Sequence, residues 1–401
     1  MHAPLESCSP ALLKVGSLFS GYGGLDLAVE HVFGAHTVWF SEINAPVSRV
    51  FSHHWPDVPN LGDITQINWR MVEPVDILCG GFPCQDVSTV GKMAGLAPGT
   101  RSGLWANMAD AIDQLHPEWV VIENVRGLLS ATAIRATPDS ATLQGGNRAT
   151  SAPATLRHLE PGLWGLGDEP DRPLRALGAV LGDLADLGYD ARWLGLPASL
   201  IGAPHPRFRV FIIARVTVPD PFGLRRRTRR GEPRSGTGTS GNDRALASGD
   251  RPRLERTRAL ERMEGRVGDI VEPDRRHDIR WGRYASAIAR WEHIVDREAP
   301  APALLSGALG FRPAPSFVEW LMGLEAGWVT ESVSQITPNQ QLTSLGNGVL
   351  PLQAVRALRL LGTHDRWICQ NDYGLSLLEA QHLSTMDTER LPDRYHCVPR
   401  P

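Results

Sequence analysis

The sequence predicts an α/β fold in which a doubly wound, mostly parallel β-sheet carries helices on both faces. Short, fully apolar runs alternate with helix-like segments over the first 130 residues, and such runs are typical of strands buried on both faces. Two of these runs end at glycine-rich turns, as expected where a strand of such a sheet leads into the next helix.

The predicted elements follow in chain order from these patterns. Apolar runs predict four strands in the first part of the chain, at 14–19, 37–41, 75–79 and 119–122. Helical segments are expected between the first three strands, at 25–33 and 47–54. Farther along, a leucine stripe predicts a helix over 174–187, followed by strands at 192–196 and 209–215 and helices at 317–322 and 350–361.

Two segments break this alternation. Residues 130–173 are rich in small residues, glycine and proline, and this composition predicts an insertion loop. Residues 219–302 form a second region that we expect to be irregular. The predicted domains are therefore a main domain over 12–216, a smaller irregular domain over 217–312, a return to the main domain over 313–362 and a tail of unknown role over 363–401.

The charge of the chain is distributed unevenly. The formal net charge of the 401 residues is only −3, and a charged fraction of 21% is ordinary for a globular protein. Residues 221–290, however, contain 18 arginines against 10 acidic residues, so this segment is basic and the remainder is acidic. A local basic segment indicates contact with a polyanion such as nucleic acid. A solvated, arginine-rich loop is the alternative interpretation.

Cysteine usage and hydropathy limit the class of protein. Five cysteines, an odd number with no C-x-x-C pair, argue against a disulfide framework and a four-ligand zinc site, and we expect no metal. Residues 1–10 lack the apolar stretch of a signal peptide, and no run approaches the ~20 apolar residues of a membrane span. We therefore expect a cytoplasmic protein without a membrane partner.

A glycine-rich turn after the first predicted strand indicates a cofactor site. The turn reads Phe19-Ser20-Gly21-Tyr22-Gly23-Gly24-Leu25-Asp26 and leads into a helix, whose first N–H groups are free to bind a ligand. Glu42 ends the second predicted strand, where a carboxylate suits two ribose hydroxyls. The pair fits NAD as well as S-adenosylmethionine, and an ordinary turn with a surface acid is the bland alternative.

A cysteine-containing loop after the third predicted strand indicates a nucleophile. The loop runs from Gly80 to Ser88 and contains Phe82-Pro83-Cys84-Gln85 at the edge where α/β proteins place their sites. A lone cysteine is more often a small buried hydrophobe. Here Pro83 stiffens the approach, the glycines leave room for a planar substrate, and a nearby helix N-terminus would favour the thiolate.

Two further motifs place charged side chains at strand ends. Glu123, in Glu123-Asn124-Val125, ends the fourth predicted strand and could face Cys84 across the same crevice. Its alternative role is that of a helix N-cap or a surface acid. In His205-Pro206-Arg207-Phe208-Arg209 the two arginines alternate, so they point the same way on an extended segment and could bind a phosphate or a base.

The order of these motifs resembles one family, the bacterial and phage DNA (cytosine-5) methyltransferases. Residues 19–26 are similar to its cofactor loop, and Glu42 to its ribose-binding acid. Cys84 lies in a segment similar to its catalytic Pro-Cys loop, and Glu123 in one similar to its catalytic Glu motif. The remaining matches are Gly62-Asp63-Ile64-Thr65 on the adenine side, His205 to Arg209 for Gln-x-Arg-x-Arg, Phe317 to Gly323 after the recognition region, and Leu345-Gly346-Asn347-Gly348-Val349 as the last motif.

This resemblance implies a Rossmann-like methyltransferase fold that uses S-adenosylmethionine. It implies that Cys84 attacks C6 of a flipped cytosine, that Glu123 holds N3 and the exocyclic amine, that Arg207 contacts the carbonyl edge and that Arg209 braces the loop. The implied cofactor-binding residues are Phe19, Ser20, Gly21, Gly23, Gly24, Leu25, Glu42, Ile43, Asp63, Ile64, Pro83, Leu104, Asn347 and Val349.

The resemblance also implies the partners. Duplex DNA would be the substrate, residues 217–312 would recognise the target sequence, and the enzyme would act as a monomer beside a separate cognate restriction endonuclease. Three positions depart from the family pattern, namely His205 in place of Gln, Ile43 in place of an aromatic, and Gly348 in place of a small polar residue. The competing hypotheses are an RNA cytosine methyltransferase, an inactive DNA-binding regulatory homologue and an NAD-dependent dehydrogenase.

Overall fold

The computed structural model describes residues 12–83, 104–131, 175–217, 250–305, 310–331 and 336–362. Most of the predicted insertion at 130–173, and all but the start of the segment after 361, lie outside these residues. The described residues up to Leu361 belong to one compact unit, and the domain boundaries predicted inside it stay predictions.

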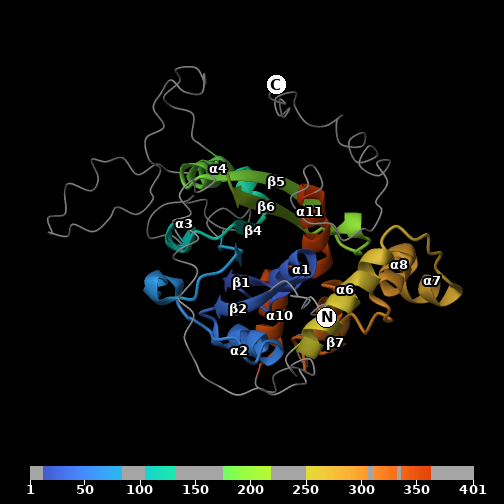
Figure 1. The fold of residues 1–401 in the computed structure, drawn as a ribbon. Coiled ribbons are helices and arrows are strands. Elements are labelled where there is room, and N and C mark those ends of the chain that lie inside the picture. Colours follow the sequence, from blue (N-terminus) through green and yellow to red (C-terminus); the bar gives the residue numbers. More distant parts are fainter. Residues whose placement is uncertain are drawn as a thin grey trace, which may run out of the picture. The chain divides into compact units, whose positions relative to one another are not determined.

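A six-stranded β-sheet runs through this unit in the order β2-β1-β3-β4-β6-β5 (Figure 1). The strands β1 to β4 pair in parallel, whereas β6 runs antiparallel to both of its neighbours, β4 and β5. The predicted mostly parallel α/β class is therefore confirmed. The strands are β1 (Leu13–Leu18), β2 (Ala35–Ser41), β3 (Ile77–Gly80), β4 (Trp119–Val125), β5 (Tyr189–Pro197) and β6 (Phe208–Val216).

The central strands are apolar because both of their faces are covered. All four residues of β3 and the first six of β4 are buried, without the alternation of a half-exposed strand. The edge strand β5 differs, since most of its side chains are half-buried or exposed. Burial on both faces explains why continuous apolar runs predicted β3 and β4 correctly, each within three residues of its observed ends.

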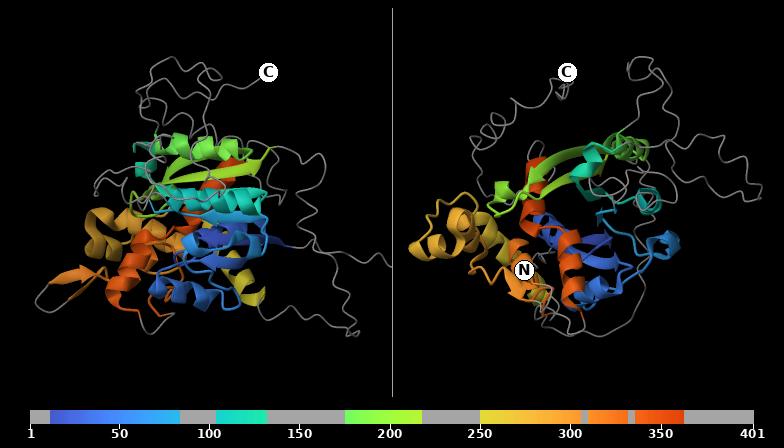
Figure 2. Two further views of the ribbon diagram at one scale, coloured as in Figure 1. Left: turned by 90° about the vertical axis from the view of Figure 1, so that its left-hand side faces the viewer. Right: turned by 180° about the vertical axis from the view of Figure 1, so that it is seen from behind.

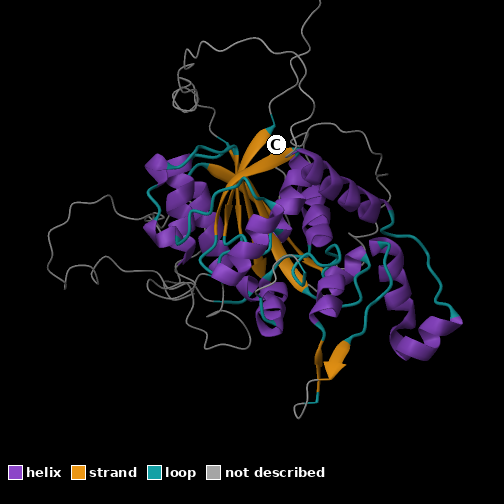
Figure 3. Ribbon diagram, turned by 90° about the horizontal axis from the view of Figure 1, so that it is seen from below, coloured by secondary structure: helices purple, strands orange, loops and turns teal. Residues whose placement is uncertain are grey.

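Helices cover the sheet on both sides (Figure 3). One face packs against α3 (Leu104–Leu115) and α4 (Ala176–Asp186), whose buried side chains share a core with Leu78, Val120 and Ile122. On the other face α1 (Gly24–Phe33) packs against β1, β2 and β3. The remaining helices of the sheet unit are α2 (Ala45–His54), α9 (Pro315–Leu321), α10 (Pro338–Asn347) and α11 (Pro351–Gly362).

The predicted irregular character of 219–302 is wrong for its second half. From Asp250 onward the chain forms α6 (Asp250–Gly265), α7 (Arg275–Trp281) and α8 (Ala285–Val295). These helices were missed because their sequence is rich in arginine, and the few apolar positions, such as Trp291, acquire a partner only through tertiary packing. The helices α3 and α10 were also not predicted.

A short hairpin follows the three helices. Its strands are β7 (Ala303–Leu305) and β8 (Phe311–Pro313), which pair antiparallel. Figure 2 shows this hairpin extending away from the body of the sheet unit. No helix in the described part of the chain combines the length and apolar character needed to cross a membrane.

Candidate active site

The predicted site residues follow four neighbouring strands at one edge of the sheet. Because β2, β1, β3 and β4 are parallel neighbours, their carboxyl ends lie together. This edge carries Glu42 after β2, the glycine-rich loop after β1, Gly81 to Pro83 after β3, and Glu123 near the end of β4. The carboxyl edge is where open α/β sheets bind their ligands.

The glycine-rich loop is shaped by residues in the left-handed region of backbone space. Phe19, the first residue after β1, has φ of +53°, a conformation that side-chain-bearing residues rarely adopt and that stores strain. The N–H of Gly23 donates to the carbonyl of Ser20 at 3.0 Å, which closes the turn before α1 begins at Gly24. The predicted strand 14–19 therefore ends one residue early, at Leu18.

Glu42 is tied to this loop through its carboxylate. One oxygen accepts the N–H of Gly21 at 3.1 Å, and the other accepts the N–H of Asn44 at 2.8 Å. The amide of Asn60 binds both main-chain groups of Glu42, at 3.1 and 3.0 Å. Burial raises the pKa of Glu42, and the backbone donors oppose that change. Asn60 was missed, since nothing in its sequence context distinguishes it.

The neighbouring residues fit an adenosine-containing cofactor to different degrees. Ser20 Oγ is buried and has no hydrogen-bond partner among the described residues, so a ligand group could bind it. Ile43 exposes 72% of its side chain beside Glu42, whereas Ile64 is packed in the core. Asp63 accepts hydrogen bonds from the N–H and hydroxyl of Thr65, both at 2.9 Å.

The last motif docks directly onto the glycine-rich loop. Tyr22 donates its hydroxyl to the carbonyl of Val349 at 2.6 Å, and a Cβ on Gly24 would lie 2.1 Å from the same carbonyl oxygen. A Cβ on Gly348 would lie 1.8 Å from the Tyr22 ring, which accounts for the glycine where the family pattern has a polar residue. Asn347 is exposed at the end of α10, and an irregular stretch over 348–350 leads into α11.

Glu123 is paired with Arg209 across two strands. In the β4–β6 register Glu123 is opposite Phe211, so Arg209 is its diagonal neighbour on the same face. Arg209 Nε lies 2.7 Å from Glu123 Oε1, and both side chains are nearly buried. Burial raises the pKa of Glu123, while the charges of Arg209 and Arg207 act to lower it.

Arg207 forms its hydrogen bonds with the last motif. Its guanidinium donates to the carbonyl of Gly346 from two nitrogens, both at 3.0 Å, and to the carbonyl of Gly348. Burial lowers the pKa of Arg207 to about 10, so the group remains charged at neutral pH. The geometry favours a division of roles opposite to the predicted one, with Arg209 beside Glu123 and Arg207 bracing the chain.

The described part of the Pro-Cys loop begins beside Glu123. The amide of Asn124 donates to the carbonyl of Phe82 at 3.1 Å, and a Cβ on Gly81 would lie 3.0 Å from Glu123 Oε2. Cys84 lies outside the described residues, directly after Pro83. Burial within β3 raises the pKa of the Cys79 thiol far above its ordinary value, so Cys79 is unsuited to act as a nucleophile.

Some supporting contacts could not be predicted from the sequence. Buried Gln353 donates to the carbonyls of Leu196 and Arg207, at 2.6 and 2.9 Å, and fixes α11 against the β5–β6 turn. His205 makes a 3.0 Å hydrogen bond to the Leu321 carbonyl, and burial lowers its pKa. No group of three or more His, Cys, Asp and Glu side chains suits a metal ion within the described ranges.

Comparison with protein families gives a match to the first part of the chain. Residues 13–140 fit the model for C-5 cytosine-specific DNA methylases. The match indicates that this segment is similar to that family. The matched segment contains the glycine-rich loop, Glu42, the Pro-Cys loop and Glu123, which are the four features gathered at the carboxyl edge.

Individual relatives are similar to part of the chain. The type II methyltransferase M.NgoFVII of Neisseria gonorrhoeae is 41% identical over 125 residues, which cover 31% of this chain and 33% of the relative. M2.BsuMI of Bacillus subtilis is 38% identical over 206 residues, covering 50% and 42%. The chain thus spans less than half the length of these relatives. The Dnmt2 methyltransferase of S. pombe, a solved structure, has 15% identity and a TM-score of 0.48 over 87% of this chain and 98% of its own.

Proposed function

We propose that this protein is a DNA (cytosine-5) methyltransferase, which transfers a methyl group from S-adenosylmethionine to C5 of a cytosine flipped out of duplex DNA. The observation that carries the proposal is the Glu123–Arg209 pair, which lies against Gly81 at the start of the Pro-Cys loop. A buried acid beside an incoming nucleophile suits a planar base that must be both held and polarised.

The side chains would divide the work on cytosine between them. The Cys84 thiolate would add to C6, which makes C5 nucleophilic. After the methyl group has been transferred to C5, loss of the C5 proton to solvent and β-elimination would break the Cys84–C6 bond and release the thiolate. Because burial raises the pKa of Glu123, a proton on this carboxyl can be donated to N3 while its other oxygen accepts the exocyclic amine. Arg209, the adjacent cation, would contact the carbonyl edge and neutralise the charge that develops there.

The cofactor would lie over the glycine-rich loop and Glu42. The Glu42 carboxylate would accept hydrogen bonds from the ribose hydroxyls. The exposed side chain of Ile43 would pack on the adenine ring. Ser20 Oγ, which has no hydrogen-bond partner among the described residues, and the exposed Asn347 would bind polar groups of the cofactor. When bound, S-adenosylmethionine supplies a methyl group on a positively charged sulfur. NAD is the alternative ligand for the same loop, and calorimetry with NAD as a control distinguishes the two cofactors.

The substrate would be bound by the basic region that follows β6. Residues 217–312 would read the DNA sequence, and α7 within them has no buried residue. Its exposed arginines, together with Arg283, are available to phosphates or base edges. The cost of flipping the cytosine, a few kcal/mol, would be offset by these contacts. We expect the protein to act as a monomer, with any cognate endonuclease separate.

The test is transfer of a tritiated methyl group to duplex DNA, with tRNA as the competing substrate. Wild-type protein should label DNA, and Cys84→Ser should abolish labelling because a hydroxyl is a far weaker nucleophile than a thiolate. Calorimetry should show that Cys84→Ser binds S-adenosylmethionine with unchanged affinity and that neither protein binds NAD. Labelling by Cys84→Ser at the wild-type rate would contradict the mechanism, and labelling of tRNA alone would make RNA the substrate.

A further inference from the structure

Tyr22 lies between two glycines that adopt left-handed conformations. The φ angles of Gly21 and Gly23 are +59° and +87°. Because glycine has access to many backbone conformations, these two positions leave the loop without intrinsic rigidity. The shape of the loop is therefore fixed by its contacts, which are those of Tyr22 together with the hydrogen bonds of the Gly21 and Gly23 N–H groups to Glu42 and Ser20.

Tyr22 is held from two sides by residues far along the chain. Its hydroxyl donates to the Val349 carbonyl at 2.6 Å, and its own carbonyl accepts the indole N–H of Trp328 at 3.0 Å. Tyr22 is fully buried and Trp328 is only 4% exposed, so water does not compete for either hydrogen bond. The side chain and the main chain of Tyr22 are thus both fixed.

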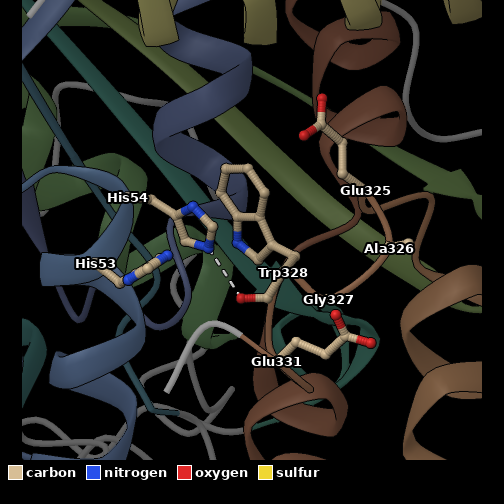
Figure 4. Close-up of a pocket in the computed structure, with 7 residues that line it drawn as sticks. All are labelled: His53, His54, Glu325, Ala326, Gly327, Trp328 and Glu331. Atoms are coloured by element: carbon tan, nitrogen blue, oxygen red, sulfur yellow. Dashed lines mark hydrogen bonds between the residues drawn. The ribbon is translucent and has the colours of Figure 1, made fainter. Parts of the chain in front are cut away.

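Trp328 is itself held by the end of α2, as Figure 4 shows. Its indole stacks on the His54 ring, with centroids 3.6 Å apart and planes inclined by 7°. His54 Nε2 is 2.9 Å from the Trp328 carbonyl. Burial lowers the pKa of His54 to about 4, so at neutral pH the ring is uncharged and its proton lies on Nε2, where it donates to that carbonyl.

The loop that carries Trp328 is organised by a buried carboxylate. Glu319 of α9 accepts the N–H groups of Gly327, Val329 and Thr330, at 2.8, 2.7 and 2.9 Å. Glu319 is only 1% exposed. A carboxylate with three backbone donors holds its loop rigidly. The position of Trp328 is therefore determined by α9, at the end of the predicted recognition region.

We propose that Trp328 is a positioning residue for the glycine-rich loop, and this inference rests on the proposed binding of S-adenosylmethionine there. The indole N–H fixes the Tyr22 carbonyl, which keeps the preceding Gly21 N–H aligned on Glu42. The loop is then already ordered before the cofactor arrives, so less conformational entropy is lost on binding. Without this donor the flanking glycines would have to be ordered by the cofactor itself.

The experiment replaces Trp328 with phenylalanine, which keeps an aromatic ring against His54 and removes the donor. Trp328→Phe should raise the dissociation constant of S-adenosylmethionine, measured by calorimetry without DNA, about three- to tenfold. At saturating cofactor, kcat and the KM for DNA should stay within about twofold of wild type, since the residue touches neither substrate. A residue that only stabilises the fold would not weaken cofactor binding while leaving kcat and the KM for DNA unchanged.

The matched control is Trp291→Phe. The Trp291 indole donates to the Trp320 carbonyl at 2.9 Å and is fully buried, so this variant loses an equivalent hydrogen bond elsewhere. Both variants should lower the melting temperature, but only Trp328→Phe should weaken cofactor binding. Equal cofactor affinity in wild type and Trp328→Phe, or equal weakening in both variants, would overturn the proposal.

A second measurement separates this inference from the proposed function. Hydrogen–deuterium exchange without cofactor should be faster at the amides of residues 21–24 in Trp328→Phe than in wild type or Trp291→Phe. Unchanged exchange in this loop would also overturn the proposal. If wild-type protein shows no affinity for S-adenosylmethionine while the exchange difference is present, the proposed cofactor has failed and the positioning of the loop by Trp328 stands.

Discussion

Two carboxylates at the same sheet edge are held in different ways. Glu42, after β2, receives hydrogen bonds from the backbone N–H groups of Gly21 and Asn44. Glu123, near the end of β4, lies against the guanidinium of Arg209. Burial raises the pKa of both groups, and although Glu42 is less buried than Glu123, they also differ in the charge of their partners.

The carboxyl edge of the sheet therefore has two parts, one around Glu42 with uncharged donors and one around Glu123 with a guanidinium. Neutral donors orient a carboxylate without cancelling its charge, which suits Glu42 to accept hydrogen bonds from uncharged hydroxyls. A guanidinium holds a buried acid in place and remains beside the reacting base. Buried Asp26, in α1, likewise has an uncharged hydrogen-bond partner, the Thr37 hydroxyl at 3.5 Å. The predictions below test this division.

The largest effect is expected from Glu123→Gln. The amide can still hold the base, but it cannot transfer a proton to N3, so kcat should fall about 10²- to 10³-fold with cofactor affinity unchanged. Steady-state kinetics and calorimetry measure the two quantities. Glu118→Gln, at a half-buried acid that directly precedes the same strand and pairs with Arg215, is the control and should be active. If Glu123→Gln turned over at the wild-type rate, proton donation by Glu123 would not be part of the mechanism.

Arg209→Ala should leave the Glu123 carboxylate buried without its cation. Breaking such a pair costs about 3–5 kcal/mol, and we expect the free energy of unfolding to decrease by about that amount. Denaturant unfolding measures the change. Lys14→Ala removes one partner of the exposed Lys14–Glu73 pair and should cost at most about 1 kcal/mol. Equal losses of unfolding free energy in the two variants would show that the buried Glu123–Arg209 pair contributes no more to stability than the exposed pair.

Asp26 should make the folded protein less stable as the pH rises. Burial raises its pKa from 3.8 to about 7, so the folded state holds the proton more tightly than the unfolded state. The contribution to stability is full below about pH 4 and is lost between about pH 4 and 7, amounting to about 4 kcal/mol.

Asp26→Asn should flatten this part of the profile, which denaturant unfolding between pH 4 and 8 can measure. The exposed Asp57 provides the control substitution, Asp57→Asn, which should keep the wild-type slope. An unchanged slope in Asp26→Asn would mean that Asp26 ionises normally inside the fold.

The smallest effect is expected from Glu42→Gln. One oxygen acceptor is retained, so the loss is limited to the negative charge that the ribose hydroxyls would bind, about 1–2 kcal/mol. The affinity for S-adenosylmethionine should fall about five- to thirtyfold by calorimetry. Glu73→Gln, on the exposed partner of Lys14, should bind normally. If the loss of affinity were as large as that expected from breaking an ion pair, a cation would have to lie near Glu42. The contrast between Glu42 and Glu123 would then not hold.

The sheet could be predicted from sequence because its strands are buried on both faces. Continuous apolar runs mark β3 and β4 directly, and burial on both faces is the physical reason for those runs. The helices from Asp250 onward could not be predicted in this way. One of the α6 residues that contact the sheet and its helices is Arg256, which pairs with buried Glu30 and stacks over Trp55. A basic residue in a basic segment gives no sign of such packing.

The site was predictable in its residue types and less so in their partners. The glycine-rich loop, Glu42 and Glu123 each follow a strand, so their meeting at one edge follows from strand order alone. The contacts of Arg207 and Arg209 depend on strand register and on a turn some 140 residues later. No local sequence pattern encodes a contact over that distance, so the sequence could not show which of the two arginines lies beside Glu123.

The hydrogen bond between Tyr22 and Val349 joins positions 327 residues apart in the sequence. During synthesis the glycine-rich loop leaves the ribosome early, while the carbonyl that fixes it is made near the end. The nascent chain can form β1 and α1 long before the loop between them reaches its final conformation. Cofactor binding should therefore begin only after α11 has emerged, which would keep partly made chains from capturing the methyl donor.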